Sequence, residues 1–232
     1  MLKITNTFKD NLVEKVIFED KTAIAESVIY SYKDRGVICF SVQSGCKVGC
    51  SFCGTGKKFI RNLTKEEMIL QIEDGIKKLP NKSKIQIMSM SMGEPTHNFN
   101  EIPIKKYLDK GHYFFVSSVG TKSFNYKLIY DYAKKYEKFG FQFSLHHWNN
   151  NKRKKLLGNY EDLLDISELI NVAKKYKKVS NKNLYFNYIA TGKETILYEE
   201  KRFEGTAKVN TLESIETTGG KIRVGSAREL LW

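Results

Sequence analysis

Two hydrophobic periods alternate along this chain. Short apolar runs rich in β-branched residues, typical of strands buried on both faces, are separated by stretches whose apolar residues fall at helical spacing. The runs predict strands at 27–32, 37–42, 85–90, 113–118, 141–145 and 184–189. The periodic stretches predict helices at 64–79, at about 124–138 and around 166–173, and a further one that follows the turn at 93–95 and ends at 110. Strands alternating with helices indicate a parallel sheet with right-handed crossovers. We therefore predict an α/β fold, a partial (β/α)6 barrel with a short N-terminal strand extension.

One β/α unit is marked most clearly. The predicted strand 37–42 leads into a loop that holds three cysteines, and the next helix begins at a capping box, Thr64-Lys65-Glu66-Glu67. Apolar residues follow at helical spacing up to Leu79, and Pro80 ends the helix. The cysteine loop is therefore predicted to connect a buried strand to a well-capped helix.

The sequence contains no linker or repeat, and its three prolines leave no Pro-rich hinge. We expect a single domain over 1–232. It would consist of an N-terminal extension at 1–35, a core barrel at 36–190 and a shortened C-terminal segment at 191–232. The alternating pattern weakens beyond Ile189.

Composition narrows the class of protein. The chain has 232 residues, of which 41% are hydrophobic, and this is enough to form a full hydrophobic core. No apolar run approaches the roughly 20 residues that span a bilayer. We expect a cytoplasmic monomer without membrane contact, in a compartment that keeps thiols reduced.

The charge is strongly positive. Lys and Arg number 39 against 26 Asp and Glu, a formal net charge of +13, and basic residues cluster at 152–155 and 174–178. A field of this sign attracts phosphates and speeds encounters with nucleic acid. Lysine also fills solvated helix faces, so charge leaves both interpretations open.

Cys46, Cys50 and Cys53 lie within eight residues, in a C-x3-C-x2-C spacing. Three thiolates can hold three irons of a [4Fe-4S] cube and leave the fourth iron to bind S-adenosylmethionine (SAM) and reduce it. Structural zinc would need a second Cys or His pair with C-x2-C-like spacing, which the sequence lacks, and a disulfide framework suits small secreted chains. Any single cysteine could be an inert buried thiol, but four glycines between 45 and 56 indicate a loop wrapped around a group.

Other polar residues follow predicted strands. In such folds, ligands bind at the carboxyl ends of the strands, so we expect the cysteine loop, Gly93-Glu94, Ser117-Ser118 and Ser144-Leu145-His146 to meet at one mouth. Glu94 and the serines could also be ordinary turn residues. Of His146 and the neighbouring His147, at most one can face the mouth if the strand continues through them.

These residues resemble one branch of the radical SAM superfamily, the adenine methyltransferases of the RlmN and Cfr type, which modify ribosomal or transfer RNA. The similarity rests on Cys39 to Cys46, on Phe59 to Thr64 with Gln71, on Ser91 to Pro95 and on Ser144 to His146. It runs from about residue 26 to residue 189.

The resemblance implies a radical SAM barrel with a [4Fe-4S] cluster on Cys46, Cys50 and Cys53, and SAM as the second cofactor. Gly93 and Glu94 would meet the methionine amino group of SAM, a cation that a carboxylate can pair with. The residues implied to contact the rest of SAM are Ser117, Ser144, Leu145 and His146.

Two further positions match catalytic groups of that family. Glu26 stands where the family carries a glutamate proposed to take a proton from the substrate, and Cys39 stands where it carries a thiol that resolves a covalent intermediate. A general base must lie within hydrogen-bond reach of its proton, and the sequence does not show such a distance. A solvated glutamate at a strand end is therefore the alternative for Glu26. This chain has His147-Trp148 where the family carries an alanine-proline pair, so substrate contacts there are expected to differ.

The family's methyl-carrier cysteine has no counterpart. The best match of its C-terminal motif, to Gly219 through Ser226, places Ser226 at that position. With three of the four cysteines on iron, only Cys39 is left. A hydroxyl is a far poorer nucleophile toward a sulfonium than a thiolate, so the two-cysteine relay is not expected to run. We also expect the family's N-terminal RNA-binding domain to be absent and its last β/α unit to be shortened, with Lys208-Val209-Asn210 as a weak echo of that strand.

The sequence thus predicts a radical SAM enzyme that modifies a nucleic acid or nucleotide, reduced by an external donor such as flavodoxin. Three explanations of Ser226 stay open: radical chemistry without a methyl carrier, a serine standing in for the carrier naturally or by engineering, or a member that binds without turnover. A small-molecule or peptide substrate, or a non-catalytic cluster-containing RNA binder, are the alternative functions.

Overall fold

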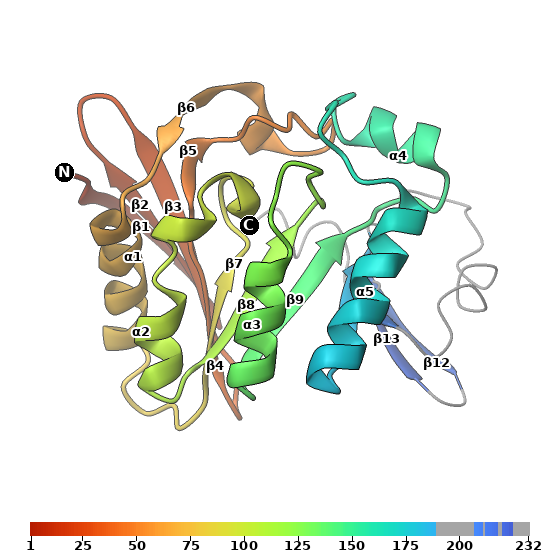
Figure 1. The fold of residues 1–232 in the computed structure, drawn as a ribbon. Helices are drawn as coiled ribbons and strands as arrows, with labels where there is room; N and C mark the ends of the chain where they lie inside the picture. Colours follow the sequence, from red (N-terminus) through yellow and green to blue (C-terminus); the bar gives the residue numbers. More distant parts are fainter. Residues whose placement is uncertain (189–206, 211, 218–219, 225–232) are drawn as a thin grey trace. The chain divides into compact units, whose positions relative to one another are not determined.

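The computed structural model describes residues 1–188, 207–210, 212–217 and 220–224 (Figure 1). The chain divides into two compact units. Unit 1 comprises Met1–Ser117 with Lys138–Gly140, and unit 2 comprises Ser118–Glu137 with Phe141–Trp232. Each unit is described by itself.

Unit 1 is mainly β structure with two α-helices among its described residues. Its elements are β1 (Lys3–Asp10), β2 (Val13–Glu19), β3 (Ile24–Ser31), β4 (Gly36–Cys39), β5 (Gln43–Gly45), β6 (Phe59–Asn62), α1 (Lys65–Lys77), β7 (Ile85–Ser89), α2 (Ile104–Asp109) and β8 (Tyr113–Ser118), with 3-10 turns at Gly54–Lys57, Pro95–His97 and Phe99–Glu101.

The sheet of unit 1 changes from antiparallel to parallel along its width. Strands β1, β2, β3 and β4 pair antiparallel in that order, and β4, β7 and β8 then pair parallel. Ile38 lies opposite Ile87, which lies opposite Phe114, and all three are fully buried. The parallel strands are therefore the apolar runs of the sequence, as expected for strands covered on both faces.

Helix α1 begins where the sequence predicts. The Thr64 side chain accepts from the Glu67 N–H, the Glu67 carboxylate accepts from the Thr64 N–H, and the capping box is complete. The helix packs closely on β4, because a Cβ at Gly75 would lie 2.9 Å from Ile38 side-chain atoms. A glycine on this face lets helix and strand approach without a clash.

Unit 2 continues the α/β pattern. Its elements are α3 (Lys127–Lys135), β9 (Phe139–Ser144, whose first two residues belong to unit 1), α4 (Asn150–Leu156), α5 (Ile166–Ser180), β10 (Leu184–Asn187), β11 (Ala207–Asn210), β12 (Leu212–Thr217) and β13 (Gly220–Val224). Strands β9, β10 and β11 pair parallel, and β12 and β13 form an antiparallel pair. Helices α3 and α5 lie side by side (Figure 1).

The predicted α/β class with parallel strands is confirmed, and several boundaries differ. The β1–β2 hairpin was not predicted because β1 is exposed along its whole length and carries no apolar alternation. The strand predicted at 37–42 ends at Cys39, and the regular helix expected before residue 110 begins only at Ile104, after two 3-10 turns. The echo at 208–210 lies within strand β11.

Candidate functional site

A short hairpin holds the cysteine loop of unit 1. Strands β5 and β6 pair antiparallel, with Gly45 opposite Phe59. The Cys46 N–H donates to the Lys58 carbonyl at 3.3 Å, which closes the loop at its base. Within it, the Cys53 N–H donates to the Cys50 carbonyl at 3.0 Å. The three cysteines therefore lie in one loop whose path is held by its own backbone hydrogen bonds.

Glycines allow this close folding. Gly45 has a φ of 76°, and a Cβ there would lie 1.7 Å from the Lys58 carbonyl oxygen. A Cβ at Gly56 would lie 2.8 Å from the Cα of Gly49, so two glycine backbones touch across the loop. At Gly54 a Cβ would meet nothing within 4 Å. Glycine is therefore required at Gly45 and Gly56, where two backbone segments touch, and not at Gly54.

The thiols lie in one another's electrostatic field. Burial raises the pKa of Cys46 to about 11, with the Glu94 carboxylate and the Cys53 thiol adding to the rise. Burial likewise raises the pKa of Cys50 to about 12, and Cys46, Cys53 and Glu94 raise it further. The structure therefore brings together the three cysteines that the sequence pairs with iron, and it adds Glu94 from a distant segment.

This donor set fits an iron–sulfur cluster. Backbone N–H groups of Val48 and Gly49 bond to the Cys46 side chain and oppose the rise of its pKa. Hydrogen bonds of this kind to cluster sulfurs tune the potential of such centres. In the part of the chain that the structure describes, no three Cys, His, Asp or Glu side chains are placed to hold a single metal ion. The corners of a cube lie farther apart than the ligands of one ion, so this finding bears on zinc rather than on a cluster.

Gln43 anchors the segment that carries Glu94. The Glu94 N–H donates to Gln43 Oε1 at 2.9 Å, and Gln43 Nε2 donates to Asn62 Oδ1 at 2.8 Å. Gly93 has a φ of 99°, and a Cβ there would lie 2.6 Å from the Gln43 Cβ. Gly93 is therefore needed so that the backbone can approach Gln43 and turn Glu94 inward.

Glu94 itself is buried, with 3% of its surface exposed. Its Oε1 accepts from the Thr96 N–H at 3.1 Å and from the Thr96 hydroxyl at 2.8 Å. Farther along, Asn98 Nδ2 donates to the carbonyls of Val42 and Leu63, each at 2.8 Å. The Glu94 segment is thus tied to both sides of the cysteine hairpin.

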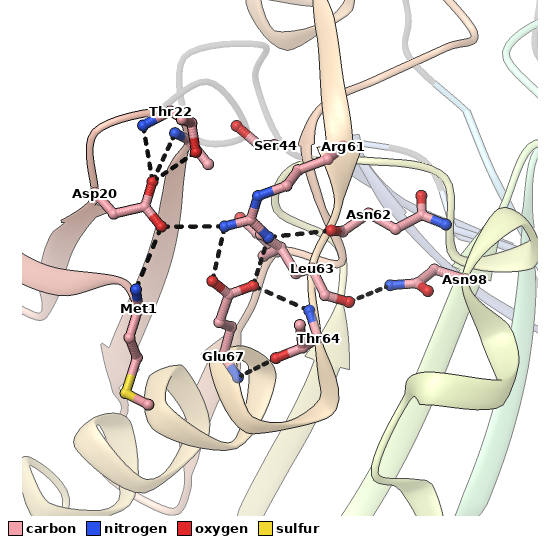
Figure 2. A network of polar contacts seen from close by, with 12 residues as sticks. Met1, Asp20, Thr22, Ser44, Arg61, Asn62, Leu63, Thr64, Glu67 and Asn98 are labelled. Carbon is pink, nitrogen blue, oxygen red and sulfur yellow. Dashed lines mark hydrogen bonds and ion pairs between the residues drawn. The ribbon is translucent and has the colours of Figure 1, made fainter.

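Arg61 links this hairpin to α1 and to the N-terminus of the chain (Figure 2). Its guanidinium donates to both oxygens of Glu67, at 2.7 and 2.8 Å, and to Asp20 Oδ2 at 3.2 Å. The Met1 amino group lies 3.7 Å from the same Asp20 oxygen. The Arg61 side-chain bond lowers the pKa of Glu67, and hydrogen bonds from Thr22 lower that of Asp20.

Glu26 lies on β3 and is paired. Its Oε2 lies 2.6 Å from Lys15 Nζ, and both side chains are partly exposed. Its backbone is held by Ser41, whose hydroxyl donates to the Glu26 carbonyl at 2.6 Å and accepts from the Glu26 N–H at 3.1 Å. The role as a base stays a prediction.

Cys39 and Ser117 lie at or near the ends of β4 and β8, which both pair with β7 in unit 1. Cys39 is the last residue of β4, between Val28 and Met88, and burial alone raises the pKa of its thiol to about 12. Ser117 is buried near the end of β8. Glu94 is among the groups that raise the pKa of Cys46 and of Cys50, and Cys39 is not.

Ser144 is the last residue of β9, and Leu145 and His146 follow it in unit 2. The strand does not continue through the two histidines, because the chain turns at His146, with a φ of 59°, and the His147 N–H donates to the Leu145 carbonyl at 2.8 Å. Both histidines are buried. The alternation argument for them therefore does not apply. Burial, then the charge of Arg153, lowers the pKa of His146 to about 3.

Arg153 is misassigned if the basic run 152–155 is taken as a surface patch. Only 2% of its surface is exposed. Its guanidinium donates to the Leu164 carbonyl at 2.8 Å and to the Val119 carbonyl. It is therefore a structural residue of unit 2, while the flanking lysines lie nearer the surface. Ser226 lies outside the described residues.

Sequence reasoning missed Gln43 and Asn98 as supports of the site. Gln43 lies inside the stretch that resembles the family's entry to the cysteine loop, and Asn98 lies four residues beyond Glu94. Neither amide could be assigned from local sequence, because the Glu94 partner of Gln43 is 51 residues away and the Val42 partner of Asn98 is 56 residues away.

Comparison with known proteins decides the family. The model of the radical SAM superfamily matches residues 40–201, more than half of the chain. The chain belongs to the radical SAM superfamily. Members of this superfamily use a [4Fe-4S] cluster together with SAM, which is the chemistry that the three grouped thiols fit.

This radical SAM protein is similar to curated RNA methyltransferases. It is 31% identical over 202 residues to a probable dual-specificity RNA methyltransferase RlmN of Clostridium beijerinckii, covering 80% of this chain and 54% of the relative. It is 33% identical over 173 residues to the protein of the same name from Pseudothermotoga lettingae, covering 71% and 49%. The chain thus spans about half the length of the curated relatives it matches.

Solved structures share the fold of this radical SAM protein. A radical SAM methyltransferase from Sphaerobacter thermophilus matches with a TM-score of 0.75 at 23% identity, over 99% of this chain and 72% of that one. SuiB of Streptococcus suis matches with a TM-score of 0.53 at 16% identity, over 82% and 43%. Among the residues that the structure describes, none of the helices is both long and apolar enough to cross a membrane.

Proposed function

We propose that this protein cleaves SAM reductively at a [4Fe-4S] cluster held by Cys46, Cys50 and Cys53, and that the resulting radical modifies a nucleic acid or nucleotide. The observation that carries the proposal is that the segment of the buried Glu94 carboxylate is hydrogen-bonded to both sides of the cysteine hairpin, through Gln43 and Asn98. A cluster with one open iron needs a cation-binding group beside it to hold the methionine end of SAM.

The residues of unit 1 have distinct parts in this proposal. The three cysteines lose protons on binding iron, and the Val48 and Gly49 N–H groups stabilise the negative charge on the Cys46 sulfur. Glu94 pairs with the amino group of SAM, held in place by Gln43 and Gly93. When bound, the cluster supplies the electron that cleaves SAM.

For unit 2 we propose that Ser144, Leu145 and His146 contact SAM, and for unit 1 we propose the same of Ser117. The low pKa of His146, about 3, keeps its imidazole neutral at physiological pH. A neutral ring can both donate and accept a hydrogen bond, as contact with an adenosine or carboxylate group requires.

The substrate proposal rests on charge and on the relatives. The chain carries a net charge of +13, and the relatives above are named as RNA methyltransferases. Because Ser226 stands where the family carries its methyl-carrying thiol, we propose that the radical acts directly on a substrate C–H bond. Glu26 and Cys39 are proposed to serve the substrate rather than the cluster. Cytoplasmic location, a single domain and a monomeric state stay predictions from the sequence.

The proposal is tested by anaerobic reconstitution with iron and sulfide, reduction with dithionite, and assay for 5′-deoxyadenosine with and without cellular RNA. We expect RNA to stimulate its formation. Stimulation by a peptide or small-molecule fraction instead would replace the nucleic-acid substrate. Deuterium passing from the SAM methyl group into RNA would show that a methyl group is transferred despite Ser226.

A further inference from the structure

The outer surface of the cysteine loop carries three exposed lysines, Lys47, Lys57 and Lys58. The segment from Cys46 to Asn62 contains no aspartate or glutamate. Among the residues that the structure describes, no carboxylate lies within ion-pair distance of any of these three amines. Among the described residues their charges are therefore not neutralised by a carboxylate, in contrast to that of Arg61 at the base of the loop, which is bound to Glu67 and Asp20.

The backbone of two of these lysines is tied to that of Cys46. The Lys58 carbonyl accepts from the Cys46 N–H, and Lys47 is the residue that follows Cys46. The close contacts at Gly45 and Gly56 hold this part of the loop in one path. The backbone that carries the three lysines is thus held in place within a few residues of the cysteines that would hold the cluster.

From this arrangement we propose that Lys47, Lys57 and Lys58 form the docking surface for an acidic one-electron carrier protein, of the flavodoxin or ferredoxin class. The inference rests on the proposed function, since it assigns the route by which the electron arrives. One electron passes from the reduced carrier to the oxidised cluster, and the carrier is oxidised by one electron. No covalent bond forms or breaks in this step.

Two observations favour a protein carrier over RNA at this surface. Single-stranded RNA is bound by stacking of its bases on aromatic rings, but Lys47 Nζ lies 4.6 Å from the centre of the Phe59 ring and covers it. Glu94, which marks the proposed SAM side of the site, is buried, whereas the three lysines are exposed. A substrate must reach SAM, while a carrier only needs to approach the cluster.

The test uses the reconstituted, cluster-bearing protein and its Lys57→Glu/Lys58→Glu variant. Anaerobic stopped-flow spectroscopy follows bleaching of the cluster absorbance with reduced flavodoxin or with dithionite. We expect the flavodoxin rate at low salt to fall roughly 10- to 100-fold, because reversing interface charges acts mainly on association. The dithionite rate should be unchanged. The matched control is Lys134→Glu/Lys135→Glu, an adjacent exposed lysine pair at the end of α3, which should match wild type with both reductants.

Two results would overturn the docking surface: an unchanged flavodoxin rate, with or without a loss of RNA affinity, or an equal fall in the control. If both reductants slow together, flavodoxin affinity measured by flavin fluorescence decides, and an affinity equal to wild type rejects the proposal. Failure of the proposed function looks different, because dithionite would then reduce the wild-type cluster without yielding 5′-deoxyadenosine.

Discussion

The backbone N–H of Glu94 donates a 2.9 Å hydrogen bond to Oε1 of Gln43, across 51 residues of sequence. This bond joins the segment that follows β7 to β5, the first strand of the cysteine hairpin. It ties the segment of a buried carboxylate to the hairpin that carries the cysteines, and the proposed chemistry depends on that placement.

Replacing Gln43 with Leu should loosen Glu94. The change leaves the Glu94 N–H and the Asn62 amide oxygen without their Gln43 partner, and a lost buried partner costs about 1–3 kcal/mol of unfolding free energy. We expect SAM affinity to fall about tenfold, as the carboxylate loses its fixed position. Urea unfolding and equilibrium SAM binding measure the two effects. Gln86→Leu on β7 is the control, and equal effects in both variants would contradict the anchoring role.

Glu94→Gln should weaken SAM binding while leaving iron content intact. The amide keeps the shape and can still accept from Thr96, but it cannot pair with an ammonium group as a carboxylate does. A charged hydrogen bond contributes about 1.5–3 kcal/mol, so we expect about a 10- to 100-fold rise in the SAM dissociation constant. Glu101→Gln, at an exposed position nearby, should change nothing. Unaltered SAM binding in the Glu94 variant would remove Glu94 from the site.

Gly56→Ala should prevent cluster assembly, and Gly54→Ala should not. A Cβ at Gly56 would lie 2.8 Å from the Gly49 Cα, whereas at Gly54 it would meet nothing within 4 Å. The backbone on both sides of the Gly56 contact must move, and the cysteines move with it. Iron and sulfide content per chain after reconstitution gives the comparison. Equal content in both variants would mean that the loop closes differently around the cluster.

Arg61→Met should reduce stability more at neutral pH than in acid. Arg61 lowers the pKa of Glu67 below its ordinary 4.5, so the ion pair stabilises the fold above that value and is lost as pH falls through the folded-state pKa. We expect a loss of about 1 kcal/mol at pH 7, since the partly exposed pair is screened by solvent. The loss should shrink between about pH 5 and pH 3.

Urea unfolding at several pH values checks this, with Lys105→Met as control because its pair with Asp109 is exposed. A pH-independent loss in the Arg61 variant would point to packing rather than charge.

Arg153→Met should destabilise unit 2 without lowering RNA affinity. The guanidinium is buried and donates to the Leu164 and Val119 carbonyls, and removing such a group costs about 2–4 kcal/mol. Lys155 on the same helix is exposed, and Lys155→Met should lower RNA affinity while leaving stability unchanged. Thermal unfolding and a salt-dependent RNA-binding titration separate them. A folded Arg153 variant that loses RNA affinity selectively would return Arg153 to the substrate surface.

Much of the α/β pattern was predictable from local sequence. The capping box at Thr64 and Glu67 and the strand 113–118 follow from side-chain chemistry and period within a few residues, and the structure has both. The β1–β2 hairpin was not predictable in this way, because β1 buries none of its side chains and its polar residues carry no period.

The site shows the same division. Cys46, Cys50 and Cys53 are close because the chain between them is short, and the resemblance to the RlmN and Cfr type led to Glu94. The turn at His146 and the burial of Arg153 were not visible, because each depends on contacts with segments far away in the sequence. A basic run indicates charge but not which of its members faces inward.

The sequence by itself determined the cysteine spacing, the alternation of strands and helices, and the absence of a fifth cysteine, since these are properties of composition and covalent neighbours. Only the tertiary structure decided that Glu94 shares the field of Cys46 and Cys50, and that Gln43 holds it there. The physical reason is that spacing acts through a few covalent bonds, whereas a buried carboxylate finds its place through strand pairing and hydrogen bonds between segments about fifty residues apart.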